Sequence, residues 1–178
     1  MTKCYPLLAA LIAILLTACG GSNKGDAADS PTPPAGNDAP GMPEGLFLDT
    51  PPADAAPLRE ARAEAKAGES IAFSGYIGGR VEPFTEGRAL FLVADSENAP
   101  ACTDECETPW DACCTALDTI AANSATVQLV DDAGKLLALN LEGMNGLKPG
   151  AAITVVGEVR EANDAVLVVD ATGLAIAD

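Results

Sequence analysis

Histidine is absent from this 178-residue chain. Without an imidazole, the chain cannot form a Ser-His-Asp or Cys-His catalytic group, and no metal ion can be ligated by histidine. Aromatic side chains are scarce, at 4% of residues with a single tryptophan. Basic residues are also few, since 10 Lys and Arg face 26 Asp and Glu for a net charge of −16. Because that charge repels phosphate backbones, we expect no nucleic-acid partner.

Long hydrophobic runs are missing except near the N-terminus, where Leu7 to Leu16 are all apolar. Ten residues are too few to cross a hydrocarbon core of about 30 Å, and after Lys3 they are typical of a secretory signal. The residues that follow, Leu16-Thr17-Ala18-Cys19, resemble the lipobox of bacterial lipoproteins. The resemblance implies cleavage of residues 1–18 and lipidation of Cys19. The alternative is an ordinary cleaved signal in which Cys19 has no role.

The same resemblance implies a location in the cell envelope, with the protein anchored in a membrane through Cys19. Each buried acyl methylene contributes about 0.8 kcal/mol, so several chains make such an anchor permanent. Asp directly after the lipidated cysteine is an inner-membrane signal in some bacteria, and Gly20 stands there instead. We therefore expect the outer membrane, with the protein facing the periplasm.

A segment rich in small and polar residues and proline separates the signal from the rest of the chain. Residues 19–57 contain too few large hydrophobic residues to offset the entropy of ordering, which predicts a disordered tether. The apolar residues 45–48 are interpreted as a weak patch in this linker, with a docking spot as the alternative. Pro57 and Gly68 favour a short helix over residues 58–67.

From residue 68 onward, apolar and polar residues alternate with a period of two, which predicts strands. The mostly β pattern favours a small barrel or sandwich. Gly75 and Gly157 lie within predicted strands, where glycine permits a bulge and strong coiling. The predicted strands cover residues 71–77, 89–94, 125–129, 135–141, 153–160 and 165–171.

One part of this pattern resembles a known fold. Leu147-Lys148-Pro149-Gly150 precedes a strand with a central glycine, then a turn and another strand, in the manner of the last two strands of OB-fold domains. The resemblance, which extends to periplasmic OB-fold proteins, implies an OB-like barrel of five to six strands over residues 68–178. This domain is acidic, with 18 acidic and 5 basic residues. It departs from the family because its helix-sized insert, residues 95–124, comes before the third strand.

The insert contains four cysteines within thirteen residues, spaced Cys-x3-Cys-x6-Cys-Cys: Cys102, Cys106, Cys113 and Cys114. The motif Pro-Trp-Asp-x-Cys-Cys looks like one found in uncharacterised bacterial lipoproteins, a likeness that brings no activity. Thr108 and Pro109 are typical of a helix start. The spacing predicts a helix ending near Asn123, with Trp110 and the adjacent thiols on its inner face.

Export to an oxidising compartment favours two disulfides among these cysteines. Adjacent residues of a helix point apart, so a bond between Cys113 and Cys114 is unfavourable. Two pairings remain open: Cys102–Cys113 with Cys106–Cys114, or Cys102–Cys114 with Cys106–Cys113. The alternative is a thiolate site for Zn²⁺ or Cu(I), although the spacing matches no common zinc motif. A catalytic dithiol is disfavoured because the neighbouring carboxylates raise thiol pKa values.

Other candidate binding residues are few. Arg80, Arg88 and Tyr76 flank or border the loop between the first two strands and are the best candidates for an anion or carbohydrate contact. Trp110 is interpreted as core packing, with a ligand-stacking platform as the alternative. The sequence singles out no nucleophile together with a base that would activate it, so we expect no enzymatic activity, and no motif predicts a cofactor. The leading hypothesis is a cell-envelope lipoprotein that acts as a non-enzymatic binding or structural module for a protein or glycan. The alternative is a metal-binding lipoprotein that uses the cysteine cluster.

Overall fold

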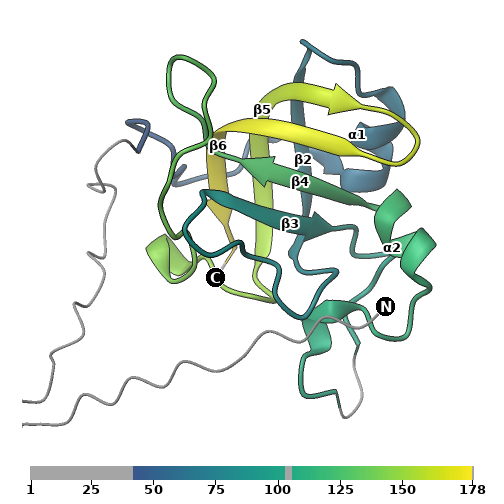
Figure 1. Ribbon diagram of the computed structural model, residues 1–178. Coiled ribbons are helices and arrows are strands. Elements are labelled where there is room, and N and C mark those ends of the chain that lie inside the picture. The colour runs from purple at the N-terminus through teal and green to yellow at the C-terminus, as the bar shows by residue number, and fades with distance from the viewer. Residues whose placement is uncertain (1–41, 103–105, 178) are drawn as a thin grey trace, which may run out of the picture. The chain divides into compact units, whose positions relative to one another are not determined.

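The computed structural model describes residues 42–102 and 106–177 (Figure 1). The predicted signal, the lipobox with Cys19 and most of the predicted tether lie outside the described residues. None of the described helices is long and apolar enough to span a bilayer. The elements are β1 (Ala56–Pro57), α1 (Leu58–Glu64), β2 (Ser70–Ile77), β3 (Leu90–Ala94), the 3-10 helix η1 (Pro109–Asp111), α2 (Leu117–Ala122), β4 (Ser124–Gln128), the 3-10 helix η2 (Met144–Gly146), β5 (Ala152–Ala162) and β6 (Leu167–Ile176).

Five of the strands close into a barrel. The sheet order is β1-β2-β3-β4-β6-β5, and β5 also pairs antiparallel with β2, from Ser70 opposite Glu158 to Tyr76 opposite Ala152. The β4 and β6 strands run parallel, and the short β1 lies outside the barrel, parallel to β2. The predicted mostly β, OB-like barrel is therefore confirmed, with the insert between β3 and β4.

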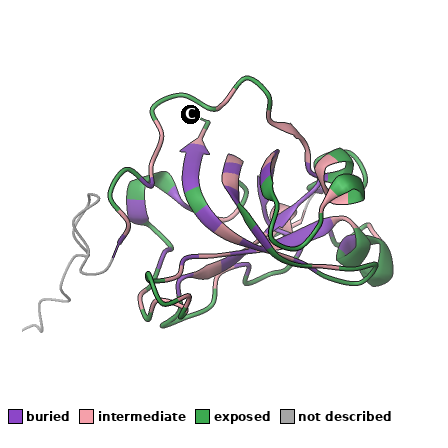
Figure 2. Ribbon diagram, turned by 90° about the horizontal axis from the view of Figure 1, so that it is seen from above, coloured by how far each residue is buried: buried purple, intermediate pink, exposed green. Residues whose placement is uncertain are grey.

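The barrel interior is filled by alternate residues of its strands, and Figure 2 shows burial concentrated on the strands rather than on the loops and helices. Phe73, Phe91 and Val155 are fully buried. The glycines within the strands allow close packing: a Cβ on Gly75 would lie 2.6 Å from the Ala94 carbonyl oxygen, and one on Gly157 would overlap the Asp170 carbonyl oxygen. The register of β5 against β6 shifts at Gly157, as expected for a bulge.

The last sixteen residues of the predicted tether contact the barrel. Residues 42–57 are described and packed, with Leu46 fully buried. The Leu48 amide donates to the Leu174 carbonyl at 2.8 Å, and the Leu174 amide donates to the Leu46 carbonyl at 2.7 Å. The edge of β6 that pairs with β4 extends past the end of β4. The apolar residues 46–48 pair with this remaining part of the edge. These residues, interpreted as a weak patch, thus form the docking contact.

Helix α1 is shorter than predicted, ending at Glu64 rather than at residue 67. Its N-terminus is stabilised from far along the chain, because the buried carboxylate of Asp95 accepts the Arg59 amide at 3.2 Å. Leu58 anchors the helix in the main core. A helix of this length is marginal alone, so these tertiary contacts account for it.

The predicted strand over residues 135–141 is wrong. That segment forms an isolated bridge between Val130 and Leu136, and Leu137 makes backbone hydrogen bonds with Leu129 and Ala89, but no strand results. Both edges of β4 are already paired, with β3 on one side and β6 on the other. The returning segment therefore has no free edge along which to extend.

Candidate thiol site

The insert is attached to the end of β2 through backbone hydrogen bonds. The Gly79 amide donates to the Trp110 carbonyl at 2.7 Å, and the Trp110 indole donates to the Val81 carbonyl at 2.9 Å. A Cβ on Gly78 would overlap the Trp110 carbonyl oxygen, so this approach requires glycine. The Cys102 amide donates to the Pro109 carbonyl at 2.7 Å. These bonds place η1 and the first cysteine against the rigid barrel.

A small second core lies beneath the insert, made of Tyr76, Ala94, Ala99, Ala112 and Ile120, with Trp110 packed against it. The Tyr76 hydroxyl donates to the Ala99 carbonyl at 2.6 Å. Burial, followed by the negative charges of Cys102, Asp111 and Asp95, raises the pKa of Tyr76 to about 12. Tyr76, one of the three candidates for ligand contact, is buried, and its aromatic ring packs in the second core.

The predicted continuous helix through Trp110 and both adjacent cysteines is also wrong. Ala112 adopts a left-handed conformation with φ 54°, which ends η1 and reverses the chain before α2 begins. The Asp111 carboxylate holds this turn, accepting the Thr108 hydroxyl at 2.9 Å and the Cys113 amide at 2.8 Å. Asp111 thus organises the turn that follows η1. Cys113 and Cys114 therefore lie between the helices rather than on one of them.

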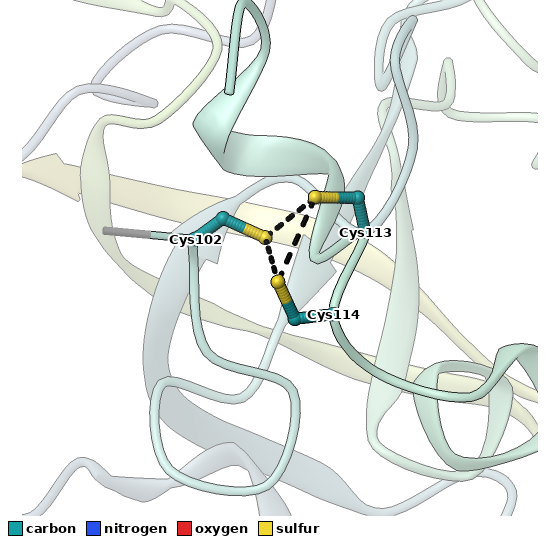
Figure 3. A group of neighbouring side chains, drawn as sticks. All are labelled: Cys102, Cys113 and Cys114. Carbon is teal, nitrogen blue, oxygen red and sulfur yellow. Dashed lines mark hydrogen bonds between the residues drawn. The ribbon is translucent and has the colours of Figure 1, made fainter. Parts of the chain in front are cut away.

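The turn directs Cys113 and Cys114 toward Cys102, as Figure 3 shows. The Cys102 sulfur lies 2.8 Å from that of Cys113 and 3.3 Å from that of Cys114, and the Cys113 and Cys114 sulfurs are 3.9 Å apart. The Cys106 sulfur lies 2.8 Å from that of Cys113. A disulfide bond measures about 2.05 Å, so these contacts are non-bonded. All four cysteines are free in this structure, and neither expected disulfide pairing is formed.

Hydrogen bonding within the cluster shifts the pKa values of the thiols in different directions. The contact with Cys113, and to a smaller extent those with Cys114 and Cys106, stabilise the Cys102 thiolate and lower its pKa. The pKa of Cys113 is raised, first by its hydrogen bond with Cys102 and then by that with Cys106. The pKa of Cys114 is raised chiefly by its hydrogen bond with Cys102. Cys102 is therefore the first of these three sulfurs to ionise.

Three sulfurs that converge in this way are suited to a soft metal ion. Cys102, Cys113 and Cys114, defined here as the thiol triad, have sulfurs all within 4.8 Å of one another. With metal–sulfur bonds of about 2.3 Å, three ligands would lie roughly 3.7–4.0 Å apart. The 3.9 Å edge already matches, and the two shorter edges would have to open by about 0.5–1 Å.

A groove of about 580 Å³ is lined in part by Trp110, and none of the triad cysteines is among its lining residues. Half-buried Trp110 and Phe84 contribute aromatic surface to it, so Trp110 serves both the second core and this groove. The remaining lining includes residues 81–86 and 140–142 together with Pro149, with the exposed carboxylates of Glu82, Glu86 and Glu142. Segments this far apart in the sequence gave no signal that they would meet.

The two arginines predicted for ligand contact are exposed but absent from the walls of that groove. Arg80 instead borders a separate hollow with Leu117 and Ile120. The loop between Arg80 and Arg88 does reach the groove, but it brings glutamates there. The residues that line the groove therefore include no basic group that could contact an anion.

Comparison with known proteins identifies no relative of this chain. No protein-family model matches the chain, and no match was found among curated proteins or solved structures.

Proposed function

We propose that this protein is a lipid-anchored cell-envelope protein that binds a thiophilic metal ion, Cu(I) or Zn²⁺, through Cys102, Cys113 and Cys114. The observation that carries the proposal is the convergence of these three sulfurs from two segments of the chain. Thiolates are the ligands that select Cu(I) and zinc from harder cations. The anchor and the envelope location rest on the lipobox resemblance at Cys19.

The acid–base state of the triad supports cation binding. A metal requires deprotonated sulfur, and Cys102 has a lowered pKa. The sulfurs of Cys113 and Cys114, whose pKa values are raised, lie 2.8 and 3.3 Å from that of Cys102, and a bound cation would displace their protons. Asp111 adds negative charge, since its field contributes to the raised pKa of Cys113. A bound cation relieves that repulsion.

The attachment of the site also supports binding. Cys102 is held at Pro109, and η1 is held to the end of β2 by Trp110. The Cys113 amide is fixed by Asp111. Ligands positioned on a rigid barrel lose little conformational entropy on binding, which favours affinity.

The test is the native mass of the mature protein, purified from membranes in detergent under reducing, oxygen-free conditions and loaded with Cu(I) or Zn²⁺. We expect one metal ion per chain, lost on acidification. Cys113→Ser should lose stoichiometric binding, whereas Cys106→Ser, outside the triad, should retain it. A protein that takes up neither metal while its thiols are reduced contradicts the proposal.

A second candidate function is a non-enzymatic binding module for an envelope protein or glycan. The groove beside Trp110, with its aromatic and acidic lining, favours it. Because the chain contains one tryptophan, intrinsic fluorescence reports directly on this groove. Titration with a neutral oligosaccharide and with a lysine-rich peptide tests it. A saturable shift abolished by Glu82→Gln and Glu142→Gln together supports the peptide, and a flat signal with both probes contradicts this candidate.

A further inference from the structure

Cys106 lies outside the thiol triad and yet contacts one of its members. Its sulfur is 2.8 Å from that of Cys113, the same separation that joins Cys113 to Cys102. Cys113 therefore has a partner on each side. It is exposed, Cys106 is half-buried, and Cys102 is buried. A soluble oxidant reaches Cys106 and Cys113 more readily than it reaches Cys102.

The contacts select between the two pairings that the sequence left open. Pairing Cys106 with Cys113 leaves Cys102 and Cys114, whose sulfurs are already in contact at 3.3 Å. Pairing Cys102 with Cys113 instead requires Cys106 to reach Cys114, although the Cys106 sulfur is directed at Cys113. Only the first pairing uses existing contacts for both bonds.

We propose that Cys106 and Cys113 form a disulfide on oxidation, and that this bond disassembles the metal site. The metal half of the proposal rests on the proposed function, whereas the pairing does not. Two thiols and one external disulfide, RS–SR, give the Cys106–Cys113 bond and two RSH. The intermediate is a mixed disulfide on one of the two cysteines, resolved when the other sulfur attacks it. Cys113 can then no longer ligate as a thiolate.

The pairing is tested with two matched double variants, each keeping Cys106 and one possible partner. Cys102→Ser/Cys114→Ser keeps Cys113, and Cys102→Ser/Cys113→Ser keeps Cys114. Both are equilibrated with glutathione buffers, and the loss of two hydrogens is read by intact mass. We expect the variant that keeps Cys113 to form its disulfide with an equilibrium constant at least about tenfold larger. If the two variants form their disulfides with equal equilibrium constants, the proposed pairing is wrong.

Variants are needed because Cys113 and Cys114 are adjacent in the chain and fall in the same proteolytic peptide, which does not distinguish their bonds. Far-UV circular dichroism of both double variants shows whether the barrel has folded. Since the two proteins differ only in which adjacent position carries serine, a general loss of stability affects them equally. A difference in oxidation therefore reports on the position of the sulfur.

The switch itself is tested with the metal-loaded full chain and with Cys106→Ser. Both are exposed to oxidised glutathione, and bound metal and mass are followed together. Wild type should release metal in step with the loss of two hydrogens, and Cys106→Ser at least about tenfold more slowly. Equal release rates overturn the switch. If wild type never binds metal, the proposed function fails, and the double variants still decide the pairing.

Discussion

The barrel and its insert are stabilised in different ways. The barrel is closed by continuous backbone ladders, and its interior contains large side chains such as Phe73 and Phe91 that are fully buried. The insert buries only small residues and Ile120 in its own core, and Leu117 of α2 is 84% exposed. Individual hydrogen bonds of Asp95, Trp110 and Asp111 hold it in place.

This difference indicates how such a protein can change state without unfolding. Hydrophobic burial in the barrel does not depend on the oxidation state of sulfur. The insert, by contrast, depends on a few directional contacts, so a change at the cysteines can rearrange it locally. Under the two proposals above, the barrel serves as a support and the thiol chemistry is confined to the insert.

The largest effect is expected in the barrel. Phe73→Ala removes a fully buried ring and should lower the free energy of unfolding by about 3–5 kcal/mol. Urea denaturation followed by circular dichroism measures it. Val81→Ala, at a side chain that is 57% exposed, is the control and should change stability by less than about 0.5 kcal/mol. If the two variants unfold alike, the barrel is not the main source of stability.

Asp95 connects the two regions, so its removal should have the next largest effect. Its buried carboxylate accepts the amides of Arg59, Glu97 and Asn98. Asp95→Ala leaves these donors unsatisfied and should cost about 2–3 kcal/mol in the free energy of unfolding. Asp132→Ala, at an exposed turn, is the matched control. If Asp95→Ala lowers the free energy of unfolding no more than Asp132→Ala does, the contacts between the insert and the barrel do not contribute to stability.

Tyr76 provides a pH test of the second core. Its pKa is about 12 in the folded protein against about 10 when unfolded. The unfolded state thus loses its proton first, and stability should fall as the pH rises from about 10 to 12. Tyr76→Phe should remove this decline, at a cost of about 1 kcal/mol from the lost hydrogen bond to Ala99. Denaturation midpoints measured across that pH range, with wild type alongside, check both. A wild-type curve that stays flat would contradict the burial of the hydroxyl.

The smallest effect is confined to the thiol triad. Because hydrogen bonding with Cys113 is the main cause of the lowered pKa of Cys102, Cys113→Ala should raise that pKa. Thiolate absorbance and the pH dependence of alkylation at Cys102 report it, and barrel stability should be unchanged. Cys106→Ala is the control, since the contact of Cys106 contributes least to the lowered pKa of Cys102. A Cys102 pKa that does not move on Cys113→Ala would contradict the hydrogen-bonded triad.

Local patterning predicted the barrel well and the insert poorly. Alternation over residues 71–77 and 153–160 located β2 and β5, because inward and outward positions of a closed barrel differ strongly in polarity. The bulge predicted at a strand glycine is confirmed at Gly157, where the register shifts, whereas Gly75 allows a close approach to Ala94. The strand predicted at 135–141 failed because its sequence carries no information about which strand edges are already occupied.

The insert shows the opposite case. The helical spacing after Thr108 is real, but Ala112 takes a left-handed conformation that nothing in its side chain favours. Contacts of Trp110 with the end of β2 and of Asp111 with the following amide determine the turn. Both depend on residues brought together by the barrel, so no local pattern could reveal them.

The sequence alone determined the mostly β class, the acidic surface, the exclusion of histidine chemistry and the four cysteines close together in the chain. These properties depend on composition and on short-range periodicity. Only the tertiary structure decided that Cys102, Cys113 and Cys114 converge, that Cys106 lies in contact with Cys113, and that residues 46–48 dock on β6. Those arrangements depend on free strand edges and on a backbone turn, which exist only once distant parts of the chain are packed together.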